Sequence, residues 1–325
     1  MISFIGSEGF AKWLALLLTI FVLCWSCSQA QITSMNSDRH NIIGARAAAL
    51  ADSYVAEQSD VGAMYWNPAT LTFSRRMSVV LNYAVERIYG SDNTMTENVV
   101  APVPLERGWG LGLGLTFSHL GRLTTVGSPI AGMSFHQFGF EVGLAKKLAR
   151  AFSIGILVDT RYGKGSSTAL GTVSSSVGAF YSPSPGVSYG VAFQGLGWGI
   201  EYNVVGGETV PSRIVLERSF QMGLSLAIPT QLDRQVVVLT LSNQKIIGVN
   251  GLVYKGGIEI IPMSFLILRT GYWVGPETSA GKLGGGIRVG KFQLDYAESL
   301  NELEPRFHQI SVSFMFGAGL SPSSH

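Results

Sequence analysis

Five histidines are the residues best suited to bind a metal ion or to act as general acids and bases: His40, His119, His136, His308 and His325. Their spacing matches no metal-binding motif such as His-Glu-x-x-His. We also find no serine nucleophile in the strand-to-helix context that acyl transfer requires. The sequence therefore predicts no metal site and no catalytic residue. A hydrolase that uses His119 and His136, which lie near predicted strand ends, stays open as a minor alternative.

Two glycine-rich strings have the composition of phosphate-binding loops but lack their context. Gly110-x-Gly112-x-Gly114 lies inside an alternating strand pattern, whereas a dinucleotide-binding loop must follow a strand and open a helix. Gly163-Lys164-Gly165-Ser166-Ser167 lacks the earlier glycine of a P-loop and suits an external loop better. We therefore expect no cofactor, and we expect that the protein is not an enzyme.

The remaining reactive residues are charged side chains that alternate with large apolar ones. Successive residues of a strand face opposite sides, so the charges share the face opposite the apolar residues. We expect that face to line a lumen, where the charges either form structural ion pairs or build a polar conduit or ligand site. The candidates are Glu141, Asp159, Arg161, Lys255, Glu259, Arg269, Arg288 and Asp295.

The elements that position these charges are strands with one continuous apolar face. Every second residue from Trp109 to Phe117 is large and apolar, and Gly110, Gly112, Gly114 and Thr116 lie between them. This alternation recurs to the C-terminus, which is typical of a barrel whose outer face meets lipid. We therefore expect arginine at Leu113 to destabilise the fold far more than serine at Gly112.

About fourteen strands can be assigned between residues 77 and 317, an even number as in bacterial single-chain barrels. The links alternate in length, as short periplasmic turns and longer external loops would. The short links lie near 147–150, 183–185, 229–233, 262–263 and 290, and the long ones cover 118–134, 161–171, 201–212, 243–251, 274–280 and 300–305. The predicted fold class is all-β: a transmembrane antiparallel β-barrel of about 14 strands with an N-terminal plug segment.

Composition agrees with an exported membrane barrel. Of the 325 residues 46% are hydrophobic and only 14% are charged, below the roughly 25% typical of soluble domains. The net charge of +2 gives no sign of nucleic-acid binding. Residues 1–30 resemble a signal peptide cleaved after Ala30, because the apolar core at 14–25 is too short to span a bilayer. Both cysteines lie in this segment, so the mature chain has none.

Residues 31–76 break the alternating pattern and predict a plug or hatch segment, or a periplasmic helix that closes the barrel mouth. An alanine-rich run, Gly44 to Leu50, precedes Asp60 and the string Met64-Tyr65-Trp66-Asn67-Pro68-Ala69. Asn67-Pro68 is a helix-start signal. The residues of this segment that we single out are Gly44, Arg46, Asp60, Tyr65, Trp66, Asn67 and Pro68.

These strings resemble the N-terminal signature of one outer-membrane superfamily, which holds the FadL-like long-chain fatty-acid transporters and the PorV/PorQ proteins of the type IX secretion system. The strings 291–297 and 307–314 are similar to the last two strands of PorV/PorQ members. Two departures stand out: Ala51-Asp52-Ser53 replaces the usual Met-Gly-Gly, and Thr70 stands where the family has glycine. The resemblance implies a fourteen-stranded barrel in the Gram-negative outer membrane, at 77–317, followed by a short tail at 318–325.

Membership of the PorV/PorQ group implies docking to a large type IX translocon protein and to the C-terminal domains of exported cargo. The working surface is then an external loop, and Tyr202, Val204 and Val205 in 201–212 are the candidates. A lid packed on the barrel is an equally good interpretation of this loop. The alternative function is a passive channel for hydrophobic small molecules, in which the plug gates a lateral path. A structural barrel with another partner is a third possibility.

Overall fold

The computed structural model describes residues 43–58, 61–74, 77–87, 94–120, 135–165, 168–205, 208–229, 236–276, 278–300 and 306–316. The predicted signal peptide at 1–30, Asp60 and the predicted tail at 318–325 lie outside these residues. An N-terminal segment comes first and holds the short helix α2 (Ala45–Ala49) and the 3-10 helices η2 (Val61–Tyr65) and η3 (Pro68–Phe73). The strands are β1 (Ser78–Arg87), β2 (Thr94–Pro104), β3 (Trp109–Leu120), β4 (Phe135–Ala149), β5 (Phe152–Gly165), β6 (Thr168–Ser184), β7 (Val187–Val205), β8 (Glu208–Val215), β9 (Ser219–Pro229), β10 (Val236–Ile246), β11 (Val253–Met263), β12 (Leu266–Val274), β13 (Ser279–Val289), β14 (Phe292–Ser299) and β15 (Arg306–Met315), with the 3-10 turn η4 (Glu106–Gly108) before β3.

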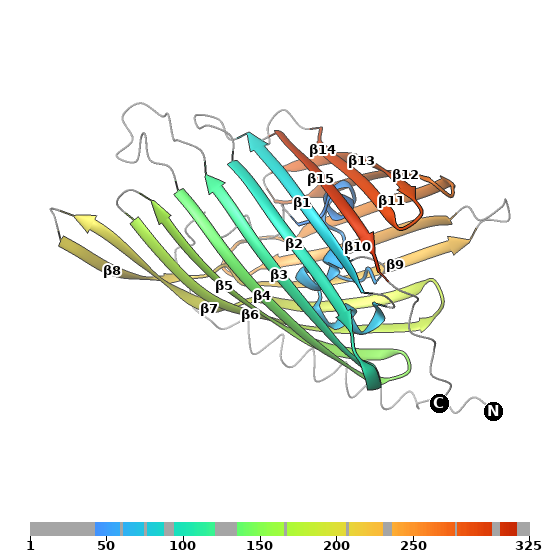
Figure 1. The fold of residues 1–325 in the computed structure, drawn as a ribbon, viewed down its shortest axis with the longest axis horizontal. Helices are drawn as coiled ribbons and strands as arrows, with labels where there is room; N and C mark the ends of the chain where they lie inside the picture. Colours follow the sequence, from blue (N-terminus) through green and yellow to red (C-terminus); the bar gives the residue numbers. More distant parts are fainter. Residues whose placement is uncertain are drawn as a thin grey trace.

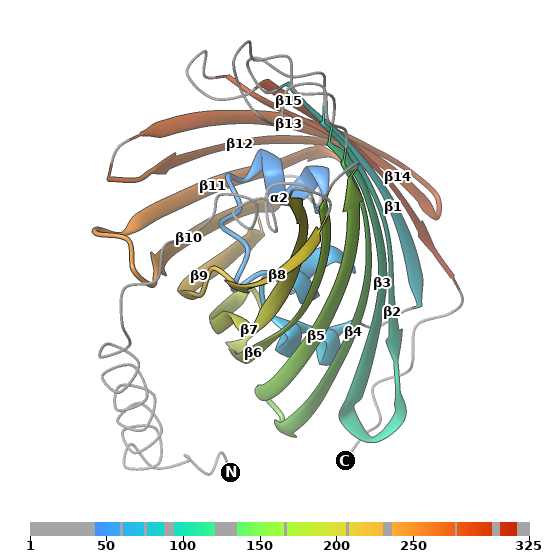
Figure 2. The same cartoon turned by 90° about the vertical axis from the view of Figure 1, so that its left-hand side faces the viewer.

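The strands form one closed antiparallel barrel (Figures 1 and 2). β1 to β6 pair in sequence order, β9 to β15 do the same, and β1 pairs with β15. β7 closes the wall because it pairs with β6 along one edge and with β9 along the other. Closure pairs both edges of every strand in the described ranges except β8, as lipid requires of the spanning wall.

β8 and β9 share one position in the wall. β9 pairs with residues 187–194 of β7, and β8 pairs with residues 198–205. Residues 216–218 are not part of a strand and separate β8 from β9. They lie opposite Gly195, whose φ of 77° is a backbone conformation that favours glycine. Fifteen strands thus occupy fourteen positions around the barrel, which confirms the predicted count.

Two predicted external loops are strands instead. Residues 201–212 form most of the β7–β8 hairpin, which extends away from the barrel at one side of Figure 1. In the segment 161–171, β5 continues to Gly165 and β6 begins at Thr168. Both segments have fewer large apolar residues than the strands of the belt, so the sequence pattern weakened before the hydrogen-bonded ladder ended.

The alternation of faces follows the prediction. The outward side chains are exposed and form an apolar belt that includes Leu81, Leu113, Leu115, Phe117, Phe138, Phe140, Ile154, Ile156, Met222, Ile228, Ile310 and Val312. Their neighbours in each strand point inward and are buried, among them Thr116, Glu141, Ser153, Asp159 and Ser311. None of the helices in the described ranges is long and apolar enough to cross a membrane.

The N-terminal segment 43–74 lies inside the barrel (Figure 2). α2 contacts β12 to β15, whereas η3 contacts β2 to β6 on another part of the inner wall. An apolar core forms where the segment meets the wall, and Leu50, Met64 and Trp66 of the segment pack there with Val100 and Leu157 of the strands. The inside of the barrel is therefore a packed core at this level.

Candidate functional site

Inward-facing glycines let the backbone of the N-terminal segment lie directly on the wall. A Cβ on Gly155 of β5 would lie 2.5 Å from the carbonyl carbon of Pro68 and 2.6 Å from the nitrogen of Ala69. A Cβ on Gly271 of β12 would lie 2.5 Å from the nitrogen of Ala51. Real Cβ atoms do not approach backbone this closely. The bare inner face is therefore shaped to fit this segment.

That Leu113→Arg costs more than Gly112→Ser stays a prediction, but the space at Gly112 is tighter than the alternation indicated. The Cβ of any side chain there would overlap the sulfur of Met64 and lie 2.9 Å from Cδ2 of Leu71. The alternation correctly placed Gly112 on the inner face. It gave no sign that another segment fills the space beside it.

Asn67 fastens the middle of the segment. Its Nδ2 donates to the carbonyl oxygens of Val55, at 3.0 Å, and of Ala179 on β6, at 2.9 Å. Its Oδ1 accepts from the nitrogen of Ala69 at 3.1 Å and so caps η3, while Pro68 takes the first helical position. This confirms the helix start predicted at Asn67-Pro68, and it adds a bond to the wall that the sequence did not indicate.

Other wall side chains hold backbone groups of the segment. Gln194 of β7 donates from Nε2 to the carbonyl oxygens of Tyr65, at 2.8 Å, and of Trp66, at 3.1 Å. Ser153 donates to the oxygen of Ala69 at 2.9 Å. Trp66 itself is fully buried and packs edge-on against Tyr54 with ring centroids 5.1 Å apart.

An ion-pair cluster joins α2 to the neighbouring strands β11, β12 and β14 of the wall. Arg46 contacts Glu259 of β11 through Nε at 2.7 Å and Nη2 at 3.0 Å, and it reaches Glu57 at 3.3 Å. Arg269 of β12 pairs with Glu259 and with Asp295 of β14, each at 2.6 Å. Burial alone lowers the pKa of Arg46, but the carboxylate of Glu259, Tyr54 and Glu57 raise that pKa well above its ordinary value.

A second cluster surrounds Tyr65 of η2. Asn98 of β2 donates from Nδ2 to the Tyr65 hydroxyl oxygen at 2.9 Å and to Thr116 Oγ1 at 2.8 Å. The Tyr65 hydroxyl in turn donates to Glu141 of β4 at 3.4 Å, and Thr116 donates to the same carboxylate at 2.8 Å. Burial, and next the charge of Glu141, raise the pKa of the Tyr65 phenol well above its usual value, so this hydroxyl keeps its proton.

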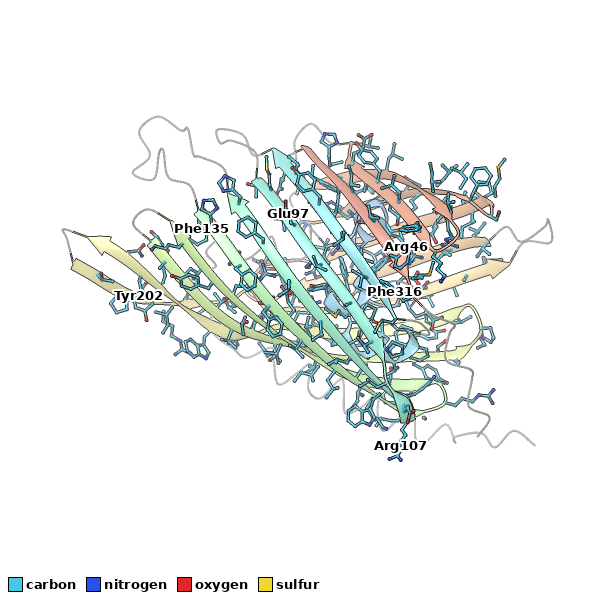
Figure 3. All side chains as sticks on the ribbon, in the orientation of Figure 1. Arg46, Glu97, Arg107, Phe135, Tyr202 and Phe316 are labelled. Carbon is cyan, nitrogen blue, oxygen red and sulfur yellow. The ribbon has the colours of Figure 1, made fainter. Side chains whose placement is uncertain are left out.

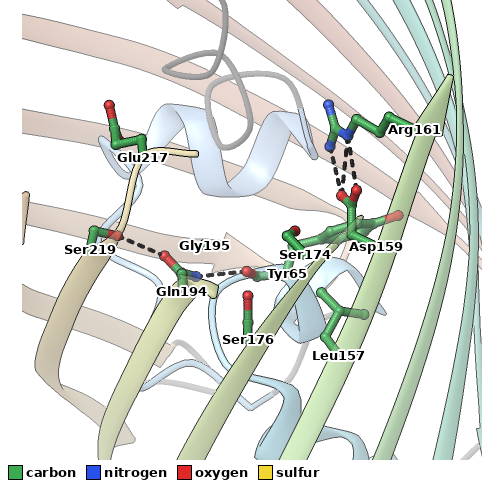
Figure 4. Close-up of a pocket in the computed structure, with 10 residues that line it drawn as sticks. All are labelled: Tyr65, Leu157, Asp159, Arg161, Ser174, Ser176, Gln194, Gly195, Glu217 and Ser219. Carbon is green, nitrogen blue, oxygen red and sulfur yellow. Dashed lines mark hydrogen bonds and ion pairs between the residues drawn. The ribbon is translucent and has the colours of Figure 1, made fainter. Parts of the chain in front are cut away.

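A small polar cavity borders this cluster (Figure 4). It encloses about 20 Å³, room for about one water molecule. Asp159 and Arg161 of β5 form a bidentate pair at its edge, with Arg161 Nη2 3.0 Å from Asp159 Oδ2. The other lining residues come mainly from β6, β7 and the break before β9: Tyr65, Leu157, Ser174, Ser176, Gln194, Gly195, Glu217 and Ser219.

The structure brings six of the eight predicted lumen charges into pairs or hydrogen-bonded clusters. Glu259, Arg269 and Asp295 belong to the Arg46 cluster, and Glu141, Asp159 and Arg161 lie near Tyr65. Lys255 also points inward on β11, where Asp52 and Glu217 act on it electrostatically. Arg288 of β13 also occupies an inward-facing position, but its side chain is exposed near the end of the strand. Its Nε donates a hydrogen bond to Gln293 Oε1 at 2.9 Å.

The remaining predicted site residues, Gly44, Tyr202, Val204 and Val205, lie outside the hydrogen-bonded clusters described above. Gly44 precedes α2 with a φ of 98°, a conformation that favours glycine. Tyr202, at the far side of Figure 3 from Arg107, is exposed on β7. Val204 and Val205 pair with Thr209 and Glu208 of β8. These three residues are therefore on a strand, where we had predicted a loop.

Nothing among the described residues assembles a catalytic group. One string the sequence analysis passed over, Gly186 to Gly190, has the Gly-x-Ser-x-Gly form of a nucleophile motif. Ser188 lies within β7, however, and its hydroxyl donates to the oxygen of Ala56 at 2.7 Å, far from any strand-to-helix turn. In the same ranges no three His, Cys, Asp or Glu side chains converge as metal ligands. The clusters instead fix the N-terminal segment.

The sequence matches no protein-family model and no curated protein. Among solved structures it is similar to the toluene transporter TbuX of Ralstonia pickettii, with a TM-score of 0.62 and 13% identity over 86% of this chain and 99% of that one. This chain has the FadL-like barrel fold. The monoaromatic hydrocarbon channel CymD has a TM-score of 0.61 and 13% identity over 86% of this chain and 99% of its own. A FadL homologue of Pseudomonas aeruginosa has a TM-score of 0.53 and 13% identity over 89% of this chain and 99% of its own.

These similarities agree with the superfamily that the N-terminal strings indicated. They give no support to the narrower PorV/PorQ assignment or to a role in type IX secretion. At such low identity the similarity establishes the fold alone. The function must therefore be argued from the interior of this FadL-like barrel.

Proposed function

We propose that this FadL-like barrel lies in the outer membrane and admits hydrophobic small molecules, with residues 43–74 acting as a gate inside it. The observation that carries the proposal is the fit between this segment and the wall. Glycines such as Gly155 and Gly271 receive its backbone, and an apolar core around Trp66 and Leu157 lies between the clusters. Hydrogen bonds, ion pairs and packing hold the segment on the wall, so a shift of the segment breaks no covalent bond.

The exposed belt supports the location. Aliphatic and aromatic side chains on the outward face, such as Leu113 and Phe140, would meet lipid, whereas buried charges such as Glu141 are kept inside. In water, an apolar surface of this extent would associate. In a bilayer it is the expected outer surface of a barrel.

The solute class rests on the apolar core between the segment and the wall and on the structural neighbours, whose titles describe transporters of toluene and of monoaromatic hydrocarbons. The described cavity near Tyr65 holds about one water, too little for a hydrocarbon. Passage therefore requires the gate to shift, or a lateral exit beside it. The break in the wall at 216–218 lies against this cavity, and it is the place where we expect such an exit.

Uptake of a lipophilic fluorescent probe, 1-N-phenylnaphthylamine, by intact cells tests the proposal, because their lipopolysaccharide leaflet resists such probes. Cells with the wild-type barrel should take up the probe faster than cells without it. The double variant Trp66→Ala, Asn67→Ala should change that rate, since it removes the bonds to Val55 and Ala179. Tyr202→Ala on the β7–β8 hairpin is the matched control and should leave uptake unchanged.

Folding must be checked beside uptake, through the heat-modifiable gel migration of each variant. Equal uptake with and without the wild-type barrel would refute the channel. Co-purification of a large translocon protein, lost when 201–212 is replaced by a Gly/Ser linker, would instead favour secretion.

A further inference from the structure

Two histidines face each other on the outer surface of the barrel. His119 of β3 pairs directly with His136 of β4, and their Nδ1 atoms lie 3.0 Å apart. The ring centroids are 4.4 Å apart, with 33° between the ring planes. Each histidine is two residues from an outward-facing phenylalanine, Phe117 or Phe138, and therefore faces outward too. The pair lies just beyond the apolar belt, at the ends of β3 and β4.

We propose that His119 and His136 form a two-histidine site for a divalent transition-metal ion, with Cu²⁺ preferred. Imidazole nitrogens bind such ions at about 2.0–2.1 Å. Two nitrogens 3.0 Å apart then subtend an angle of about 94° at the metal, which is the angle of neighbouring ligands in square-planar or octahedral coordination. The same geometry places the ring centroids about 4.6 Å apart, close to the observed 4.4 Å.

The neighbouring strands add to the chemistry of the pair. Met95 of β2 lies directly opposite His119 and is exposed, so its thioether is within reach as a third ligand. Imidazole ligands suit copper, and Cu²⁺ is the tightest binder in the first-row divalent series, whereas a thioether is the softer ligand that Cu⁺ prefers. Lys164 of β5 lies opposite His136 and opposes cation binding, but its ammonium is on a flexible, exposed side chain. Glu97, outward-facing on β2, supplies a nearby negative charge.

The site exists only when β3 and β4 are paired, because the two histidines are 17 residues apart in sequence. A metal that binds them therefore stabilises the folded barrel and not the unfolded chain. This separates the proposed site from histidines that bind metal independently of the fold. The simpler alternative is a hydrogen bond between two neutral imidazoles, which needs no metal.

A Cu²⁺ titration distinguishes the metal site from a simple hydrogen bond between the two imidazoles. It uses the full-length barrel in detergent, prepared without a histidine tag. The wild type should bind one equivalent with an electron paramagnetic resonance spectrum that reports two nitrogen ligands. His119→Asn and His136→Asn should each weaken binding by at least about tenfold, whereas Met95→Leu should weaken it less. His308→Asn is the matched control, because His308 faces Tyr296 and no second histidine in the structure.

The midpoint of urea unfolding provides a second measurement. Cu²⁺ should raise it for the wild type and for His308→Asn, and should leave it unchanged for His136→Asn. Equal affinities for the wild type and His136→Asn, or a spectrum without two nitrogens, would show that the pair is a hydrogen bond only. The outcome does not depend on uptake of hydrophobic probes, so the metal site and the proposed channel stand or fall separately.

Discussion

Alanine at Gly155 should reveal how tightly the N-terminal segment fits the wall. The new Cβ would lie 2.5 to 2.7 Å from backbone atoms of Pro68 and Ala69, where ordinary contact begins near 3.4 Å. The segment or the strand must therefore move by almost 1 Å. Forced overpacking of this kind costs about 1–3 kcal/mol.

Gly171 provides the matched control, since a Cβ there would meet nothing within 4 Å. Both glycines lie in neighbouring strands, and neither has a positive φ. Replacing glycine by alanine in a strand contributes roughly 0.5–1 kcal/mol of stability in either variant. The difference between Gly155→Ala and Gly171→Ala therefore isolates the overlap, at about 1–3 kcal/mol.

Reversible urea unfolding of the barrel in lipid vesicles, followed by tryptophan fluorescence, measures this difference. Gly155→Ala should have the lower midpoint at an unchanged slope. Its probe uptake should also rise, because the gate no longer seats fully. Equal midpoints for the two folded variants would mean that the backbone of η3 does not rest on β5, and the argument for a shaped seat would fail.

Three further perturbations test the faces, the ion pairs and assembly. Leu113→Arg should destabilise the barrel by about 2–4 kcal/mol in the same urea assay, whereas Leu148→Arg at the end of β4 should cost about 0–1 kcal/mol. Equal costs would contradict the position of Leu113 near the middle of the lipid-facing belt. Glu259→Gln should lower the free energy of unfolding by about 3–5 kcal/mol, because it removes the carboxylate that pairs with Arg46 and Arg269. The control, Arg288→Gln at an exposed position, should cost roughly 0.5 kcal/mol or less. A small effect of Glu259→Gln would show that the cluster does not hold α2. Phe314→Asp combined with Phe316→Asp should abolish outer-membrane assembly, because it removes the aromatic end of the last strand, where the two ring centroids lie 4.3 Å apart. Deletion of 317–325 should leave assembly intact, and normal levels of the double variant on membrane fractionation would refute this.

The faces of the barrel could be predicted from sequence because strand geometry is local. Alternation from Trp109 to Phe117 fixes which residues point outward, whatever the rest of the chain does. The lumen position of Glu141 and the helix start at Asn67 followed from equally local rules. Where apolar residues gave way to Glu201, Asn203 and Pro211, that signal disappeared, and a strand hairpin was mistaken for a loop.

Only the tertiary structure determined which inward-facing residues contact one another. Glu259 and Arg269 face each other across the β11–β12 hairpin, but Arg46 and Glu57 reach them only because the N-terminal segment folds into the barrel. Strand register, set by pairing along each hairpin, places His119 against His136 and Asp159 beside Glu141. The inner glycines looked like empty positions because their neighbour is a backbone about 40 to 220 residues away in sequence. A pattern of side-chain faces determines which residues point inward, whereas their partners depend on how the whole chain closes.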